Sequence, residues 1–219
     1  MKRAGIPALV LLSIVIAANH PAAVPPPTAS GDALLSTGKY EDFEKPGVCA
    51  SCHVDIAMQW SQAMMSQSYT HHWDEIEYFK LAVPHAAKDP KVAGVKAGCN
   101  GCHAPNAFMA GDVPPPTPDK GSRANEGVSC DICHTITGRG EGEPHNFSFT
   151  ISPGRTKYGN RDGVESPHHN TKFLEFTRSP EMCGTCHNEK SPYGIWVKAT
   201  QLEWAAGPYA KEGVRCHDC

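Results

Sequence analysis

The chain has 219 residues, which is enough for one or two ordinary domains. Its 20 Lys and Arg residues are nearly balanced by 23 Asp and Glu residues, which excludes the basic excess typical of nucleic-acid-binding proteins. Cysteine and histidine are unusually frequent, at 10 and 12 residues, and they stand beside 20 glycines and 19 prolines. We therefore expect a loop-rich chain whose small apolar core needs a covalent or metal-based staple.

The N-terminus has the pattern of an export signal. A short basic start precedes an apolar run over residues 6–18, which is too short to span a membrane comfortably and gives way to small residues and prolines. We predict a signal peptide over residues 1–23 and a periplasmic or otherwise extracytoplasmic protein. The alternative is an uncleaved N-terminal anchor, which would be the route to membrane association. A flexible leader is expected over residues 24–39, followed by one domain over residues 40–219.

All ten cysteines fall into Cys-x-x-Cys pairs, and each of the first four pairs is followed directly by histidine. On a helical turn, residues i and i+3 lie on one side, so both sulfurs can reach the two vinyl groups of one porphyrin. The following histidine projects from the same face and can place a ring nitrogen on the iron. Cys-x-x-Cys-His is the attachment signature of haem c. The motifs are Cys49, Cys52 and His53; Cys99, Cys102 and His103; Cys130, Cys133 and His134; and Cys183, Cys186 and His187.

Zinc ribbons and a disulfide scaffold are two other interpretations of paired cysteines in an exported chain. Neither requires histidine after every pair, and disulfides within Cys-x-x-Cys are usually redox-active. Haem attachment explains both features. The fifth pair, Cys216 and Cys219, ends the sequence where histidine would follow. We therefore expect four complete haem sites and a fifth that is interrupted because the sequence is truncated.

Between the motifs, the sequence predicts short helices and long loops. Ile56, Trp60 and Met64 recur every four residues, as on one apolar helix face. Further helices are expected over residues 72–83, ending before Pro84, and over residues 200–206. Segments 112–123 and 138–163 should be loops. The fold class is thus mainly α with long irregular loops, a multihaem cytochrome c fold in which the haems form the core.

Alternating long and short intervals between the motifs indicate an internal repeat. The first cysteines are separated by 50, 31, 53 and 33 residues, and both short intervals end in Glu-Gly-Val-x-Cys, at residues 126–130 and 212–216. The pattern suggests a two-haem unit in which residues 99–134 correspond to the segment from residue 183 onward.

The remaining histidines are candidates for the second axial position on iron. His169 and His145 are the strongest, because each lies in a long loop before a haem motif, and His85 is next. Met64 or Met65 would be a thioether ligand for the first haem, although helix packing is an equal interpretation of Met64. The weaker candidates are His71, His72 and His168, and His217 is interpreted as a spacer between attachment cysteines.

These motifs resemble the multihaem cytochromes related to hydroxylamine oxidoreductase and its tetrahaem electron-acceptor cytochrome. The resemblance covers roughly residues 48–219. It implies haems packed in close stacked and perpendicular pairs, and a histidine at the place of His169 that ligates the iron of another haem. The chain departs from the relatives after Gln59-Trp60, where many have a histidine and this sequence has Met64 and Met65. Its other carrying segments are Gly127–His134, Ser166–His169, Cys183–His187, Glu203-Trp204 and Pro208–Val214.

We therefore predict an exported electron carrier in which haem iron cycles between ferric and ferrous states. Its partners would be redox proteins such as quinol-linked cytochromes and other haem proteins, and nucleic acid is not expected. The alternative is a multihaem oxidoreductase acting on a small nitrogen or sulfur oxyanion such as nitrite, hydroxylamine or tetrathionate. No motif distinguishes a catalytic haem, so we predict no catalytic residue.

Overall fold

The structure is a computed structural model that describes residues 34–218. The predicted signal peptide lies outside the described residues, as do residues 24–33 of the predicted leader and Cys219. In the part of the chain that is described, none of the helices has the length and apolar character needed to cross a membrane.

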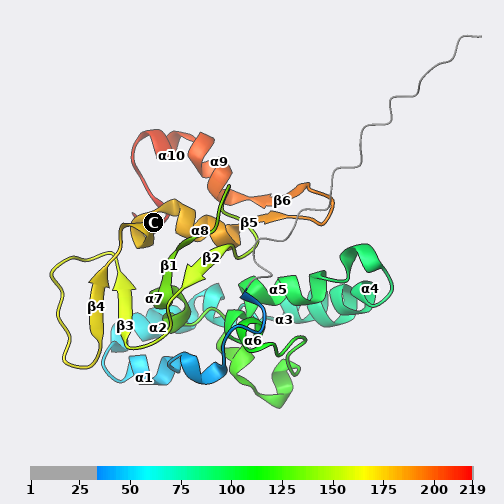
Figure 1. Cartoon of the computed structure of the whole chain (residues 1–219), viewed down its shortest axis with the longest axis horizontal. Coiled ribbons are helices and arrows are strands. Elements are labelled where there is room, and N and C mark those ends of the chain that lie inside the picture. The colour runs from blue at the N-terminus through cyan, green and yellow to red at the C-terminus, as the bar shows by residue number, and fades with distance from the viewer. Residues whose placement is uncertain (1–33, 219) are drawn as a thin grey trace, which may run out of the picture.

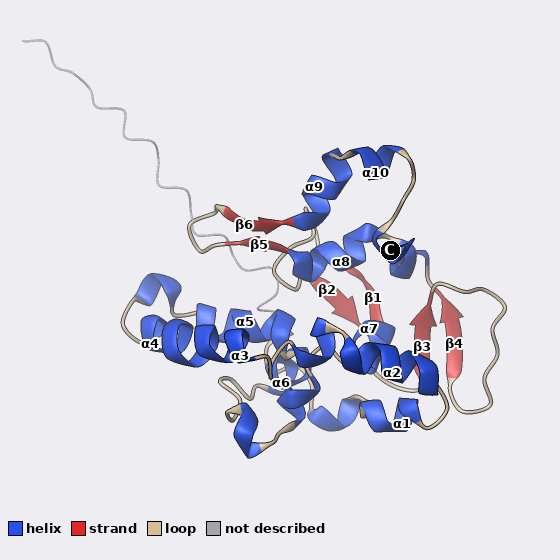
Figure 2. Ribbon diagram, turned by 180° about the vertical axis from the view of Figure 1, so that it is seen from behind, coloured by secondary structure: helices blue, strands red, loops and turns tan. Residues whose placement is uncertain are grey.

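Most of the regular structure is helical, in short segments joined by irregular chain (Figure 1; Figure 2), as the sequence predicted. The α-helices are α1 (Pro46–Ala50), α2 (Val54–Gln62), α3 (His72–Glu75), α4 (Val83–Ala86), α5 (Val95–His103), α6 (Pro105–Ala110), α7 (Cys130–Thr135), α8 (Pro180–His187), α9 (Thr200–Ala206) and α10 (Pro208–Lys211). The 3-10 turns include Tyr40–Asp42, Met64–Gln67, Pro90–Val92, Pro118–Lys120, Arg123–Glu126, Glu175–Arg178 and Cys216–Asp218.

Three small two-stranded sheets lie between the helices. Two are antiparallel and one, β3–β4, is parallel, with Thr156 paired to Asn170. The prediction that residues 138–163 form only loop is therefore wrong. The strands escape sequence detection because each has only three or four residues, too few for a clear alternating pattern. The strands are β1 (Ile136–Arg139), β2 (Phe149–Ile151), β3 (Thr156–Gly159), β4 (Asn170–Phe173), β5 (Asn188–Lys190) and β6 (Trp196–Ala199).

Helix α2 is shorter than the apolar periodicity predicted. It ends at Gln62 because Ala63 adopts an extended backbone with ψ of 147°, and Met64 begins a separate 3-10 turn. Ile56 is 63% exposed, so the predicted helix face is not a packed face of the chain. Trp60 is the half-buried member of the set, and its Nε1 donates to the Val128 carbonyl at 2.9 Å.

The predicted helix over residues 72–83 exists but does not stop before Pro84. Helix α3 continues through a π-helical segment, Ile76–Ala82, into α4, which ends at Ala86. The Val83 N–H bonds to the Tyr78 carbonyl, five residues back, which widens the turn. A widened turn gives the ring of Pro84 room within the helix. Helix α9 matches its prediction, and residues 112–123 are irregular apart from one short turn.

The chain has two modest apolar clusters of its own. The first joins α6, α7 and the β1–β2 sheet, and the second lies between α6 and the π-helical segment. Helix α6 contributes to both and is almost entirely buried. The clusters consist of Phe43, Phe108, Met109, Ile132, Ile136, Phe147 and Phe149, and of Tyr69, Tyr78, Ala104, Ala107 and Ala124.

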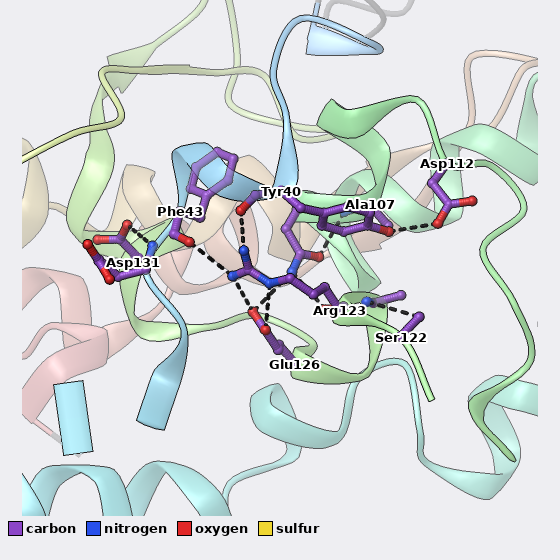
Figure 3. Close-up of polar contacts among 11 residues, drawn as sticks. Tyr40, Phe43, Ala107, Asp112, Ser122, Arg123, Glu126 and Asp131 are labelled. Atoms are coloured by element: carbon purple, nitrogen blue, oxygen red, sulfur yellow. Dashed lines mark hydrogen bonds and ion pairs between the residues drawn. The ribbon is translucent and has the colours of Figure 1, made fainter. Parts of the chain in front are cut away.

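Arg123 fastens the N-terminal end of the described chain to the body of the fold (Figure 3). Its guanidinium donates to the carbonyls of Tyr40 and Phe43 and forms an ion pair with Glu126, Nε to Oε1, at 2.7 Å. The hydroxyl of Tyr40 in turn donates to the Asp112 carboxylate at 2.8 Å. The segment that leads into α1 is thereby held against the turn that precedes α7.

Replacing Arg123 by methionine should lower the free energy of unfolding by about 2 kcal/mol, because two backbone carbonyls and Glu126 lose a half-buried charged donor. Chemical denaturation of the haem-loaded protein measures the change. Arg139→Met is the matched control, since Arg139 forms the same kind of pair with Glu181 at 2.8 Å on the surface. Equal losses in both variants would contradict the role given to Arg123.

Candidate haem-binding sites

Helical turns present each of the first four Cys-x-x-Cys-His motifs. Helices α5 and α8 end on His103 and His187, and α7 begins at Cys130. In the first motif the His53 N–H bonds to the Cys49 carbonyl at 2.9 Å, which is a helical turn between α1 and α2. Both cysteines and the histidine therefore lie along one side of a turn, as the spacing predicted.

The fold brings different motifs into contact through their thiols. A side-chain hydrogen bond joins Cys49 to Cys130, which raises the pKa of Cys49 and lowers the pKa of Cys130 to about 7. Cys183 likewise bonds to Cys216. The first motif is thus adjacent to the third, and the fourth to the fifth. Of the nine cysteines that are described, which exclude Cys219, none is paired in a disulfide.

The second and fourth motifs meet in the same way. A side-chain hydrogen bond joins Cys102 to Cys186, and it raises the pKa of Cys102 and lowers that of Cys186. Burial, with smaller contributions from Lys198 and His103, lowers the pKa of His187 and so favours the neutral imidazole that binds metals.

A loop with a strained backbone contacts both of these motifs. Asn146 and Phe147 both have positive φ, at 47° and 52°, a backbone region that non-glycine residues rarely adopt. The Phe147 N–H bonds to the carbonyl of Thr185, inside the fourth motif, at 2.5 Å. The Phe147 ring lies over Gly101, inside the second motif, where a Cβ would come within 2.3 Å of it. Glycine is therefore required between the cysteines of that motif.

A tryptophan–valine hydrogen bond occurs twice in the fold, and it relates other motifs than the intervals predicted. Trp60 donates from Nε1 to the Val128 carbonyl, and Trp204 donates to the Val214 carbonyl, both at 2.9 Å. Trp60 follows the first motif and Val128 precedes the third, whereas Trp204 and Val214 lie between the fourth and the fifth. The first and third motifs thus correspond to the fourth and fifth, and the second motif lies in a segment inserted into the first copy.

A further contact appears in both copies. The residue after the first cysteine bonds to the backbone just before the partner motif's helix. In the first copy Asp131 accepts from the Glu44 N–H at 2.8 Å, and in the second His217 Nε2 bonds to the Thr177 carbonyl at 2.7 Å. His217 has this contact in addition to its place as a spacer.

Several histidines are oriented by a bond from Nδ1 to a backbone carbonyl. His134 bonds to the carbonyl of Tyr158 and His103 to that of Ser68, both at 2.8 Å. A proton held on Nδ1 leaves Nε2 as the metal-binding nitrogen. The donor set therefore fits haem iron.

The structure places His169 opposite the histidine of the first motif. The ring centroids of His169 and His53 are 6.2 Å apart. An iron bound by two imidazoles at about 2 Å each separates the ring centroids by roughly 6 Å. His169 also bonds through Nδ1 to the Asn170 carbonyl at 3.1 Å. The ring separation of this pair and the Nδ1 contact of His169 both fit one bis-histidine iron.

The other candidate ligands have different surroundings. His145 precedes the strained loop, bonds through Nδ1 to the Glu143 carbonyl and packs edge-on to Trp196. His85 is on α4 with its side chain 64% exposed, and its Nε2 is 3.9 Å from Asp89. Met64 and Met65 lie on the surface beyond α2. These residues stay predictions as ligands.

The surroundings of the motifs are unusually open and apolar. A cavity of about 150 Å³ lies beside Cys99 and His103 and is lined by Tyr69, Tyr78 and Phe79, among others. Near the first motif, four apolar side chains are each more than half exposed, which is typical of surface that covers a ligand. They are Val48, Val54, Ile56 and Met58.

Sequence reasoning missed the residues that join the motifs. Asp131, Phe147 and Lys157 had no assigned role, although Asp131 and Lys157 form a buried ion pair at 2.5 Å. A charged residue between attachment cysteines was the available signal for Asp131. Among the described residues, no group of three or more His, Cys, Asp or Glu side chains is arranged to hold one metal ion.

Residues 48–135 match the protein family described as cytochrome c554 and c-prime. The fold is similar to that of a penta-heme cytochrome c552 from Thermochromatium tepidum, with a TM-score of 0.50 and 20% sequence identity. The likeness covers 76% of this chain and 51% of the other, so the chain spans about half of that cytochrome. No curated protein matches the chain. The motifs, the family match and the shared fold together support a multihaem c-type cytochrome.

Gly101→Ala should destabilise the haem-loaded protein by roughly 1–3 kcal/mol, because the new methyl group displaces the buried Phe147 ring. Gly98→Ala, in the same helix and with no atom within 4 Å of its added Cβ, should be neutral or slightly stabilising. Chemical denaturation of both variants tests the packing of Phe147 against Gly101. Similar effects of the two substitutions would show that Phe147 does not constrain the second motif.

Proposed function

We propose that this chain is an extracytoplasmic electron carrier that holds haem c at four complete sites and at a fifth beginning with Cys216. The observation that carries the proposal is the contact between thiols of different motifs. Attachment sites that touch hold their cofactors within short electron-transfer distance of one another. Haem supplies the redox chemistry by cycling between ferric and ferrous iron.

The contacts support one connected series of sites. The third motif touches the first through Cys130, and its Cys133 lies close enough to Cys183 and Cys186 for their charges to influence its pKa. The fourth motif also touches the second, through Cys186, and the fifth, through Cys183. The fourth site is therefore proposed as the junction of the series.

The residues of the chain have distinct roles in this proposal. The paired cysteines form the thioether links, and His53, His103, His134 and His187 are the proximal ligands. His169 is the second ligand of the first iron, and His145 and His85 are candidates at other sites. Backbone carbonyls accept from Nδ1 of several histidines and so fix the orientation of these imidazole rings.

Partners are proposed to be redox proteins such as quinol-linked cytochromes and other haem proteins. Contacts with such partners are expected to be small and transient, as is usual for electron-transfer encounters. Export rests on the predicted signal peptide, and the reactions would take place in the periplasm or another extracytoplasmic compartment.

The proposal is tested on the full-length chain produced in a host that matures c-type cytochromes. Covalent haem quantified per chain should match the number of motifs, and electron paramagnetic resonance should show low-spin iron that does not bind nitrite or cyanide. A chain without covalent haem would refute the proposal. A native high-spin haem that binds nitrite would favour the oxidoreductase instead.

His169→Gly should convert one haem from low-spin to high-spin, because the first iron loses its second imidazole while its covalent attachment remains. His168→Gly is the matched control, since His168 is the exposed neighbour. Visible and electron paramagnetic resonance spectra of both variants measure the change. An unaltered spectrum in the His169 variant would remove His169 from the ligand set.

A further inference from the structure

The third motif contains a buried ion pair. Asp131, between the attachment cysteines, has a side chain that is 1% exposed, and its Oδ1 lies 2.5 Å from Nζ of Lys157 on β3. The Lys157 side chain is itself 16% exposed. A carboxylate this deeply buried needs a partner charge, so the position of β3 is strongly constrained by α7.

The same carboxylate also holds the segment that carries the first motif. Its Oδ2 accepts from the Glu44 N–H at 2.8 Å, two residues before α1 begins. Asp131 therefore connects the segment before α1 to α7 and β3. Figure 1 shows where these elements lie. These are three of the segments that surround the first and third motifs.

The β3–β4 ribbon is in turn connected to two candidate axial histidines. The residue after Lys157 is Tyr158, whose carbonyl accepts the Nδ1 bond of His134 in the third motif. The paired strand β4 begins at Asn170, in register with Thr156, directly after His169. His169 faces His53 of the first motif. One two-stranded ribbon thus carries contacts to the ligands of two different sites.

We propose that the Asp131–Lys157 ion pair is a positioning device that couples axial ligation of the first and third haems. The effect on the first haem passes through the β3–β4 ribbon, because Lys157 lies on β3 and His169 directly precedes the paired strand β4. The inference rests on the proposed haem attachment. It assigns to Lys157 an effect on a haem whose motif lies more than a hundred residues earlier in the sequence.

The test is Lys157→Met in the full-length, haem-loaded chain. The expected result is a new high-spin haem signal like that of His169→Gly, together with a lower reduction potential of the third haem, because an unpaired Asp131 carboxylate favours ferric iron. Lys157→Arg should retain the low-spin spectrum. Lys172→Met is the matched control, since Lys172 lies on the paired strand with its ammonium over the Tyr158 ring at 5.8 Å.

Measuring the haem content of each variant distinguishes failure of haem attachment from failure of the coupling. A Lys157→Met protein that carries the full number of haems and remains entirely low-spin would overturn the coupling and leave haem attachment intact. A change confined to the third haem would also overturn it. If Lys157→Met does not accumulate, the neutral double variant Asp131→Asn with Lys157→Met replaces it. That variant should show the same high-spin signal, and a wholly low-spin spectrum would overturn the inference.

Discussion

Proximity of cysteines from different Cys-x-x-Cys pairs is the feature around which the described fold is arranged. A motif on its own fixes one cofactor to one helical turn. Where Cys49 lies near Cys130, and Cys102 near Cys186, helices that are far apart in sequence are brought close together. The short helices, the tight loops and the small sheets are arranged so that these meetings occur. The chain's own apolar clusters are too modest to determine such an arrangement alone.

The two kinds of meeting are stabilised by different physical means. The first and third motifs are joined by charge and backbone hydrogen bonds around Asp131. The second and fourth are joined by shape, because the ring of Phe147 fills the space that Gly101 leaves open. The positive φ of Phe147 costs conformational energy, which packing of the buried ring and its N–H bond to Thr185 offset. Polar contacts thus hold one pair of motifs together, and apolar packing holds the other.

Local features of this chain could be predicted from sequence, and features that depend on distant contacts could not. The motif turns follow from i, i+3 spacing, and α9 follows from local pattern. Two Glu-Gly-Val segments indicated a repeat. The lengths of the intervals did not indicate which motifs correspond, because they do not reveal that Trp60 reaches Val128 across the second motif. The helix through Pro84 depends on a π-helical turn that no local propensity indicates. His169 was singled out by its loop, whereas its position opposite His53 requires the β3–β4 pairing.

Comparison of the two repeat copies shows which part of the Asp131 contact is structural and which is specific. Both copies bond the residue after the first cysteine to the backbone before the partner helix, with opposite polarity. Asp131 accepts from an N–H, whereas the His217 ring donates from Nε2 to the Thr177 carbonyl. In the second copy the exposed ion pair of Arg215 with Glu175, at 3.8 Å, accompanies this bond. The buried ion pair of Asp131 with Lys157 is additional to the backbone bond that both copies share. Burying an ion pair costs free energy, and proteins can keep such a pair because it favours one arrangement over others. In this chain the pair holds β3, whose partner strand β4 directly follows His169.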